Sequence, residues 1–211
     1  MAALGQMIRD GGPIIVVLIA LSLLSLALIV WKVIELWHAV GGRAARAQAL
    51  SDWQDGRPEA AIAVLRTGRS PADRVAAYAM EALSEGVTGP RLEAELTRRG
   101  NEELATMARH IRLLELIAMI SPLLGLLGTV TGMIQSFQML AAAEGSANAS
   151  VLAGGIWQAL LTTAAGLMVA IPAAVAAGLL SARIDAAGQR IESAVGELML
   201  IEGGRAVPAA G

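Results

Sequence analysis

Residues 117–171 read IAMISPLLGLLGTVTGMIQSFQMLAAAEGSANASVLAGGIWQALLTTAAGLMVAI. This stretch contains two apolar runs, each long enough to cross a bilayer as a helix, and a short polar connector between them. Small and hydroxylated residues recur at three- and four-residue steps within each run, so on a helix they share one face. In the first run this face holds Pro122, Gly125, Thr129, Gly132 and Ser136; in the second it holds Gly155, Gln158, Thr162 and Gly166, with Thr163 beside them.

These faces have two interpretations, close packing of helices and a path for ions. Glycine and other small residues let helix backbones approach closely in a membrane. Gln158 fits packing less well. A buried amide without a partner costs roughly 1–3 kcal/mol, so it must bond across a helix pair or face water. The sequence leaves both interpretations open. We expect helix packing at Pro122, Gly125, Gly128, Gly132, Gly166 and Pro172.

The composition is typical of a membrane protein. Of the 211 residues, 55% are hydrophobic and 16% are charged, whereas a soluble domain carries about 25% charged residues. The net charge of −2 gives no reason to expect nucleic acid as a partner, and the lack of cysteine excludes disulfides. His38 and His110 lie far apart without HExxH spacing, and no phosphate-binding GxxxxGKS or GxxxxGKT pattern occurs. We therefore expect no enzyme activity, no catalytic residue, no metal and no cofactor.

A first spanning helix is expected over residues 13–40. Residues 13–30 form an unbroken apolar run followed by Trp31 and Lys32, residue types typical of a membrane interface. A cleaved signal peptide is the competing interpretation, but the run is too long for one and lacks a small-residue cleavage site. Residues 1–12 form a short polar lead on the outer face, which Gly11-Gly12-Pro13 separates from the helix.

Residues 41–112 are hydrophilic and rich in alanine and arginine, and they predict a solvated helical domain. From Arg91 a helical pattern continues past Gly100 without a strong stop. It predicts one long helix that starts in water and enters the membrane near Leu113. Breaks between earlier helices are expected where glycine and proline gather, at residues 55–58, 67–71 and 86–90.

The remaining boundaries follow from the apolar runs. The second span covers residues 113–140, with a kink expected at Pro122, and the third covers residues 154–182. A connector over 141–153 separates them, and residues 183–211 continue as an amphipathic helix and a frayed tail. Arginine is frequent before the second span and after the third, and the connector has none. The positive-inside rule therefore predicts a periplasmic N-terminus and connector, with the large domain and the C-terminus in the cytoplasm.

The central parts of the second and third spans hold no titratable group. No Asp, Glu, Lys, Arg or His occurs between Ser121 and Gln138, or between Ala153 and Ser181. Proton relays inside membranes are built from such groups. A proton path along these two helices would therefore need an acid that another subunit supplies.

Two motifs in these spans resemble the signatures of the ExbB/TolQ/MotA proton-channel proteins. Residues 121–133, SPLLGLLGTVTGM, followed by Ser136-Phe137, are similar to the second-span signature. Residues 159–167, ALLTTAAGL, closing on AIPA at residues 170–173, are similar to the third-span signature. The layout of three spans favours the ExbB/TolQ branch, because MotA has four.

The resemblance implies a fold, partners and a location. Members of this branch are all-α inner-membrane proteins of bacteria, with three transmembrane helices and long cytoplasmic helical extensions. Five copies form a homopentameric ring that membrane lipids surround. Spans two and three line the apolar pore of this ring. Single-span helices of an ExbD/TolR-like partner, usually two, lie in the pore, and their aspartate carries the proton. The proton-motive force then does mechanical work on a TonB- or TolA-like envelope protein. The pore threonines of the family fall on Thr129 and Thr163, and we expect the proton pathway at Thr129, Thr163, Gln158 and Thr162.

One departure from the family pattern concerns Gln158. Many ExbB and TolQ proteins have glutamate in a Gly-Ile-x-Glu-Ala-Leu context, whereas residues 155–160 read GIWQAL. Glutamine forms hydrogen bonds but does not titrate. Either the glutamate is not needed for proton transfer, which we favour, or the mechanism differs. A non-conducting membrane scaffold that holds a partner helix is therefore the alternative function. A solute transporter is disfavoured, because three spans without a repeat offer no inverted symmetry.

Overall fold

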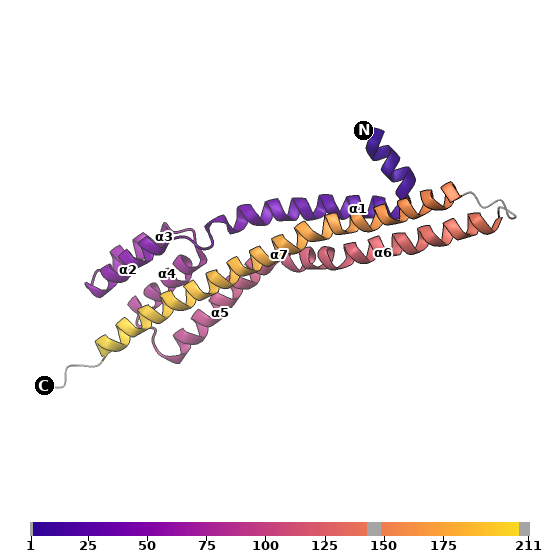
Figure 1. The fold of residues 1–211 in the computed structure, drawn as a ribbon. Coiled ribbons are helices and arrows are strands. Elements are labelled where there is room, and N and C mark those ends of the chain that lie inside the picture. The colour runs from indigo at the N-terminus through magenta and orange to yellow at the C-terminus, as the bar shows by residue number, and fades with distance from the viewer. Residues whose placement is uncertain (1, 143–148, 207–211) are drawn as a thin grey trace. The chain divides into compact units, whose positions relative to one another are not determined.

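The computed structural model describes residues 2–142 and 149–206, and every regular element within those ranges is a helix (Figure 1). The chain divides into two compact units. The first, here called the apolar unit, comprises Met1–Lys32 and His110–Leu179. The second, here called the arginine-rich unit, comprises Val33–Arg109 and Leu180–Gly211.

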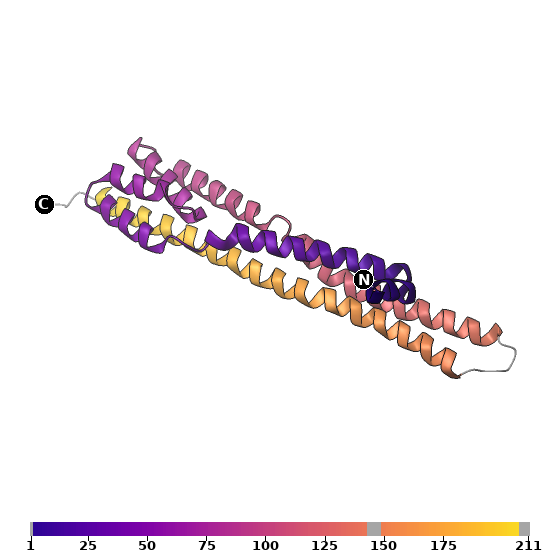
Figure 2. The ribbon, with the colours of Figure 1, turned by 90° about the horizontal axis from the view of Figure 1, so that it is seen from above.

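Three long helices supply the apolar unit: α1 (Ala2–Glu35), α6 (Ile111–Ala142) and α7 (Ala149–Ala206). Each contains a segment long and apolar enough to cross a membrane, which confirms the three spans predicted from the sequence. Figures 1 and 2 show α6 and the first half of α7 side by side, with α1 running along them. Helices are the expected solution, because a bilayer offers no water to pair the backbone N–H and C=O groups.

The predicted break before the first span lies at Gly12. Its backbone has φ 61° and ψ −161°, a conformation outside the helical region, and Pro13 follows it. Glycine has no Cβ to oppose a positive φ, and proline near the start of a helix costs little because its missing N–H would be unpaired there. The first turns of α1 therefore leave the direction of its main part (Figure 1).

The single long helix predicted from Arg91 into the membrane is wrong. The chain instead forms α5 (Pro90–Ala108) and α6, with a break at Arg109 and His110. Arg109 is extended, with ψ 133°, and His110 has φ 70°. A left-handed residue interrupts the ladder of backbone hydrogen bonds. No glycine or proline stands at this break to indicate it in the sequence.

The arginine-rich unit packs four short helices and the last part of α7 around one core. These helices are α2 (Arg43–Gln54), α3 (Pro58–Arg66), α4 (Pro71–Ser84) and α5, and a 3-10 turn, η1 (Leu36–His38), precedes them. They end and begin where glycine and proline predicted breaks. The core includes Trp53 from α2, Met80 from α4 and Leu198 from α7. The indole Nε1 of Trp53 also donates a hydrogen bond of 2.8 Å to Glu202 Oε1 on α7.

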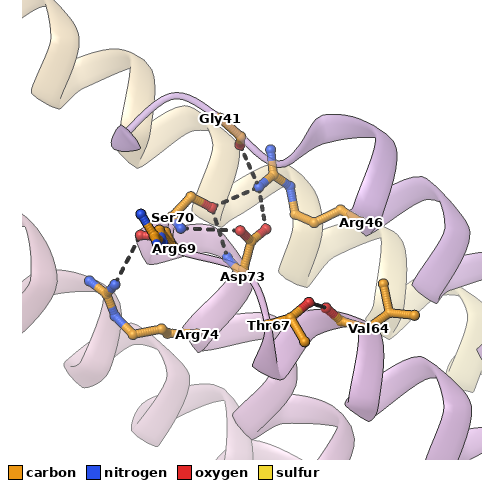
Figure 3. Close-up of polar contacts among 8 residues, drawn as sticks. All are labelled: Gly41, Arg46, Val64, Thr67, Arg69, Ser70, Asp73 and Arg74. Carbon is orange, nitrogen blue, oxygen red and sulfur yellow. Dashed lines mark hydrogen bonds and ion pairs between the residues drawn. The ribbon is translucent and has the colours of Figure 1, made fainter. Parts of the chain in front are cut away.

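A buried ion pair fixes the start of α4 (Figure 3). Ser70 and Asp73 form a capping box, in which each side chain accepts a hydrogen bond from the other residue's backbone N–H. The guanidinium of Arg46 lies 2.6 Å from Asp73 Oδ1 and donates further bonds to Ser70 Oγ and the Gly41 carbonyl, both at 2.9 Å. The side chains of Arg46 and Asp73 are 9% and 1% exposed, so the two charges depend on each other.

Both prolines of the second and third spans lie inside continuous helices. α6 runs through Pro122 and α7 runs through Pro172. α7 continues without a break past residue 182, as the amphipathic pattern of its sequence predicted, and is helical to Ala206. The connector predicted over 141–153 is shorter in the structure, because α6 extends to Ala142 and α7 begins at Ala149. Residues 143–148 of that connector and residues 207–211 of the predicted tail lie outside the described ranges.

Candidate functional site

The candidate site, here called the crossing, is the stretch of the apolar unit where glycines of α6 and α7 pack against the opposite helix. Gly125 of α6 and Gly166 of α7 form its centre. A Cβ added to Gly166 would lie 2.5 Å from the Ser121 carbonyl oxygen and 3.2 Å from the Gly125 Cα. A Cβ added to Gly125 would lie 2.9 Å from the Thr163 Cα. These neighbours are backbone atoms, so the two helices approach this closely because neither glycine carries a side chain.

Further glycines extend the contact toward the connector between α6 and α7. A Cβ on Gly132 would lie 3.1 Å from the Ala159 Cβ, whereas one on Gly128 would meet the Thr162 side chain. The four glycines expected in helix packing thus all lie against the opposite helix. Of the two prolines expected there, Pro122 is half-buried and Pro172 is exposed. A packing role for these residues stays a prediction.

Two threonine hydroxyls of α7 meet a single carbonyl of α6. Thr163 Oγ1 donates to the Gly125 carbonyl oxygen at 3.0 Å. Thr162 Oγ1 donates to the same oxygen at 3.3 Å and to the Ala159 carbonyl at 2.7 Å. Hydrogen bonds between helices are a recurring form of attachment in membranes, where each is worth roughly 0.6 kcal/mol. The glycine at position 125 makes these bonds possible, because a Cβ there would crowd the Thr163 backbone.

The hydroxyls of α6, unlike those two, donate within their own helix. Thr129 Oγ1 donates to the Leu126 carbonyl at 2.7 Å, and Ser121 Oγ donates to the Ile117 carbonyl at 2.7 Å. Thr131 and Ser136 form corresponding bonds of 2.9 Å and 2.8 Å to the Leu127 and Gly132 carbonyls. Each of these hydroxyls therefore uses its only proton on the backbone and presents lone pairs to any further partner.

The structure separates the four residues expected to form the proton pathway into two pairs. A cleft of about 330 Å³ opens beside the crossing, and Gln158 and Thr162 belong to its lining, whereas Thr129 and Thr163 do not. Thr162 and Thr163 nevertheless both donate to the Gly125 carbonyl, and Thr129 follows Gly125 by one helical turn.

Other residues of the cleft were not predicted as site residues. Thr131 belongs to the second-span motif without an assigned role and Gln135 lies outside that motif, but both line the cleft with Gln158. Residues 12–14 of α1 also contribute, so three helices form this cleft. Periodicity within one helix shows which residues share a face but not which helix lies opposite that face. None of the lining residues that the structure describes is ionisable, and their polar side chains are amides and hydroxyls.

Comparison with known proteins gives a family and several named relatives. The sequence profile of the MotA/TolQ/ExbB proton channel family matches residues 67–193. A putative biopolymer transport protein, ExbB-like 3, of Synechocystis is 34% identical over 165 residues, which cover 76% of this chain and 77% of the relative. The biopolymer transport protein exbB1 of Vibrio cholerae is 52% identical over 82 residues, 39% of this chain and 36% of the relative. The Tol-Pal system protein TolQ of Haemophilus influenzae is 37% identical over 101 residues, 48% of this chain and 44% of the relative.

Proposed function

The chain belongs to the MotA/TolQ/ExbB proton channel family, in its ExbB/TolQ branch, and we propose that it is the ring-forming subunit of a proton-driven motor. It is a multi-pass protein of the bacterial inner membrane. In the proposed motor, an ExbD/TolR-like single-span partner carries the proton, and the proton-motive force does work on a TonB- or TolA-like envelope protein. The N-terminus faces the periplasm and the C-terminus faces the cytoplasm, as the arginine distribution predicts.

The chemistry of the α6–α7 crossing carries this proposal. Six hydroxyls and the amide of Gln158 lie along the apolar segments of the two helices, and the sequence places no titratable side chain between residues 122 and 137 or between 154 and 180. Such a wall offers hydrogen bonds at membrane depth but cannot itself gain or lose a proton. The proton carrier is therefore an acid on a guest helix, which is the division of labour that an ExbD/TolR-like partner would supply.

The proposed assembly is a ring of five copies around two partner helices. Two small-residue faces and a large exposed apolar surface support it, because a single chain leaves side chains such as Met119, Leu160 and Met168 exposed. Lipid covers part of this surface, and neighbouring copies and the guest helices cover the rest. Native mass spectrometry of the detergent-extracted protein measures the copy number. Five copies are expected, and a predominantly monomeric protein would contradict the ring.

Proton flux tests the function itself. The chain is co-expressed with the single-span protein of a neighbouring gene that has one aspartate just inside its apolar run. The purified complex is placed in liposomes that contain a pH-sensitive dye, and a membrane potential is applied. Flux is expected from the complex and not from either protein alone. Replacing the partner aspartate by asparagine should abolish the flux, because the asparagine side chain cannot titrate.

A matched pair of variants connects the flux to the crossing. Thr163→Val replaces a hydroxyl at the site by a methyl group and should reduce the flux. Thr97→Val makes the same change on α5, where the exposed Thr97 hydroxyl donates to the Glu93 carbonyl, and should leave the flux unchanged. A complex that assembles with its partner but conducts nothing would identify the chain as a scaffold. Flux through the chain alone would exclude a guest acid as the carrier.

A further inference from the structure

Two grooves flank α7 within the arginine-rich unit. The first, here called the acidic groove, lies between α5 and α7 and has a volume of about 270 Å³. Its floor is apolar, with Leu96 and Leu104 from α5 and Ile191 from α7. The charged side chains that the structure places in its lining are Glu93 and Glu192, one from each helix. Such a groove suits side chains that are apolar along their length and positively charged at the end.

The second groove, here called the basic groove, lies between α2 and α7 and has a volume of about 540 Å³. Arg43 of α2 and Arg190 of α7 line it, together with Arg46, whose charge is already used in its buried ion pair. The acid in the described lining, Glu197, accepts a hydrogen bond of 3.0 Å from Ser193 Oγ. The two remaining arginines outnumber this acid, so the groove is positively charged.

The two acids of the acidic groove and the two remaining arginines of the basic groove have no partner of opposite charge. Within the residues that the structure describes, none of the four takes part in an ion pair. The arginines of the unit that do take part are Arg46, Arg57, Arg66, Arg74, Arg98 and Arg99. Arg69 and Arg91 also lack an ion pair, but they line neither groove. Each groove thus brings together two unpaired charges of one sign.

The two grooves open on different sides of α7. Arg190 and Glu192 are two positions apart, which corresponds to about 200° of rotation around a helix. These two charges of one chain therefore point away from each other and cannot pair within that chain. In a ring with rotational symmetry, each copy contacts its two neighbours through two different surfaces. A chain with an acidic surface on one side and a basic surface on another has what such a ring needs.

We infer that, in the ring, the basic groove of each copy docks against the acidic groove of the next copy. This inference rests on the proposed function, because it takes the ring from there. The hydrocarbon stems of Arg43 and Arg190 cover the apolar floor of the neighbouring groove, and their guanidinium groups bond to Glu93 and Glu192 of that copy. Like charges meet if a copy is reversed, so the contact also fixes the direction in which the copies follow one another.

A second copy accounts for both grooves with one contact. A basic peptide bound in the acidic groove would leave Arg43 and Arg190 without partners. An anion bound in the basic groove would leave Glu93 and Glu192 without partners. Charge complementarity between two sides of the same chain therefore favours another copy over two unrelated ligands.

Cysteine cross-linking tests the contact in membranes that contain the complete complex. The chain has no cysteine, so only its introduced thiols react. Ala47 lines the basic groove, Asn101 lines the acidic groove, and both are exposed. Two differently tagged chains, one with Ala47→Cys and the other with Asn101→Cys, are co-expressed and treated with a bis-maleimide. We expect a cross-linked dimer that carries both tags.

Each variant expressed alone tests the direction of the contact. A head-to-tail contact brings residue 47 of one copy to residue 101 of the next, so neither variant alone should form a cross-linked dimer. A chain with both substitutions should form a ladder of cross-linked multimers. A dimer from either single variant would show that like surfaces meet, which would overturn the inference.

Charge reversal tests the pairing in the same assay. Arg43→Glu with Arg190→Glu on the first chain makes both surfaces acidic and should lower the yield of the two-tag dimer by roughly threefold or more. Adding Glu93→Arg with Glu192→Arg on the second chain restores opposite charges and should restore the yield. Restoration by a second pair of substitutions also excludes misfolding as the cause of the first loss. Arg69→Glu lines neither groove and should leave the yield unchanged.

The cross-linking results separate the contact from the ring itself. A two-tag dimer that decreases with one reversal and returns with the second supports the contact. If no such dimer forms, or if the reversals leave its yield unchanged, the two grooves do not meet and the inference is overturned. The proposed motor then stays intact, provided that native mass spectrometry still finds five copies. A monomeric protein in that measurement would remove the ring as well.

Discussion

Gly166→Ala is the most direct perturbation of the crossing. The new Cβ would lie 2.5 Å from the Ser121 carbonyl oxygen, whereas ordinary contacts of this kind begin near 3.4 Å. The helices must therefore separate locally by about 0.9 Å, the difference between those two distances. If both move as rigid rods, the 3.0 Å bond from Thr163 to the Gly125 carbonyl lengthens to about 3.9 Å, which is no longer a hydrogen bond.

The energetic cost combines two effects. Overpacking of a close contact costs about 1–3 kcal/mol, and the lost interhelical bond adds roughly 0.6 kcal/mol. We therefore expect Gly166→Ala to lower the free energy of unfolding by about 2–4 kcal/mol. The measurement titrates the detergent-solubilised protein with sodium dodecyl sulfate and follows α-helical circular dichroism.

The matched control is Gly178→Ala on the same helix. A Cβ there meets no atom within 4 Å, so the substitution should cause no loss of stability. If Gly166→Ala unfolds at the same detergent concentration as the unchanged protein, the close contact at Gly166 does not stabilise the fold. Equal destabilisation by both substitutions would also refute the role of this contact, because the effect would then come from alanine in α7 in general and not from the crossing.

Two further predictions concern the arginine-rich unit. Asp73→Asn leaves Arg46 buried without its ion pair and should lower the free energy of unfolding by about 3–5 kcal/mol. Arg66→Gln breaks an exposed pair with Glu81 and should lower it by less than about 1 kcal/mol. Thermal denaturation measures both losses, and losses of similar size would contradict the difference between a buried and an exposed pair. Hydrogen bonds from Arg98 and then Arg99 lower the pKa of Glu95 from 4.5 to about 2, so its contribution to stability is fully present above pH 4.5 and is lost as the pH falls through about 2. The difference in melting temperature between the unchanged protein and Glu95→Gln should thus be constant from neutral pH to about pH 5 and shrink only below that, and a decrease already between pH 7 and 5 would exclude this origin.

Local sequence rules predicted the features of the fold that depend on neighbouring residues. The apolar runs have the length that a bilayer requires, and all three appear as helices. Gly12 followed by Pro13 indicated the break in α1, and Pro58, Pro71 and Pro90 each stand at the first residue of a helix. The helical continuation of α7 beyond residue 182 followed from its amphipathic pattern.

The features that sequence reasoning missed depend on residues far apart in the chain. The bond between Arg46 and Asp73 joins residues 27 positions apart. The chain's one lysine, Lys32, was expected at a membrane interface but is 1% exposed, with its Nζ 5.6 Å from the Trp31 ring centroid. The break at His110 carries only a weak local signal, because a positive φ is uncommon for any residue but glycine, even though histidine adopts it more often than most. Tertiary packing decides these three features, and a window of neighbouring residues does not show how the chain packs.

Packing and ion transfer stayed separate interpretations of the polar faces, because contacts between residues far apart in the chain decide what each face meets. In the proposed motor, one carbonyl links helix packing to ion transfer. Because Gly125 has no side chain, α7 comes close enough for the Thr163 hydroxyl to bond to the Gly125 carbonyl, and that bond leaves only lone pairs for a guest. A larger residue at position 125 or 166 would separate the helices and free the hydroxyl to turn and donate. In the flux assay with its partner, Gly166→Ala should therefore reduce the proton flux as Thr163→Val does, because both substitutions remove the bond from Thr163 to the Gly125 carbonyl. An unchanged flux in Gly166→Ala would show that helix packing at this glycine does not control ion transfer.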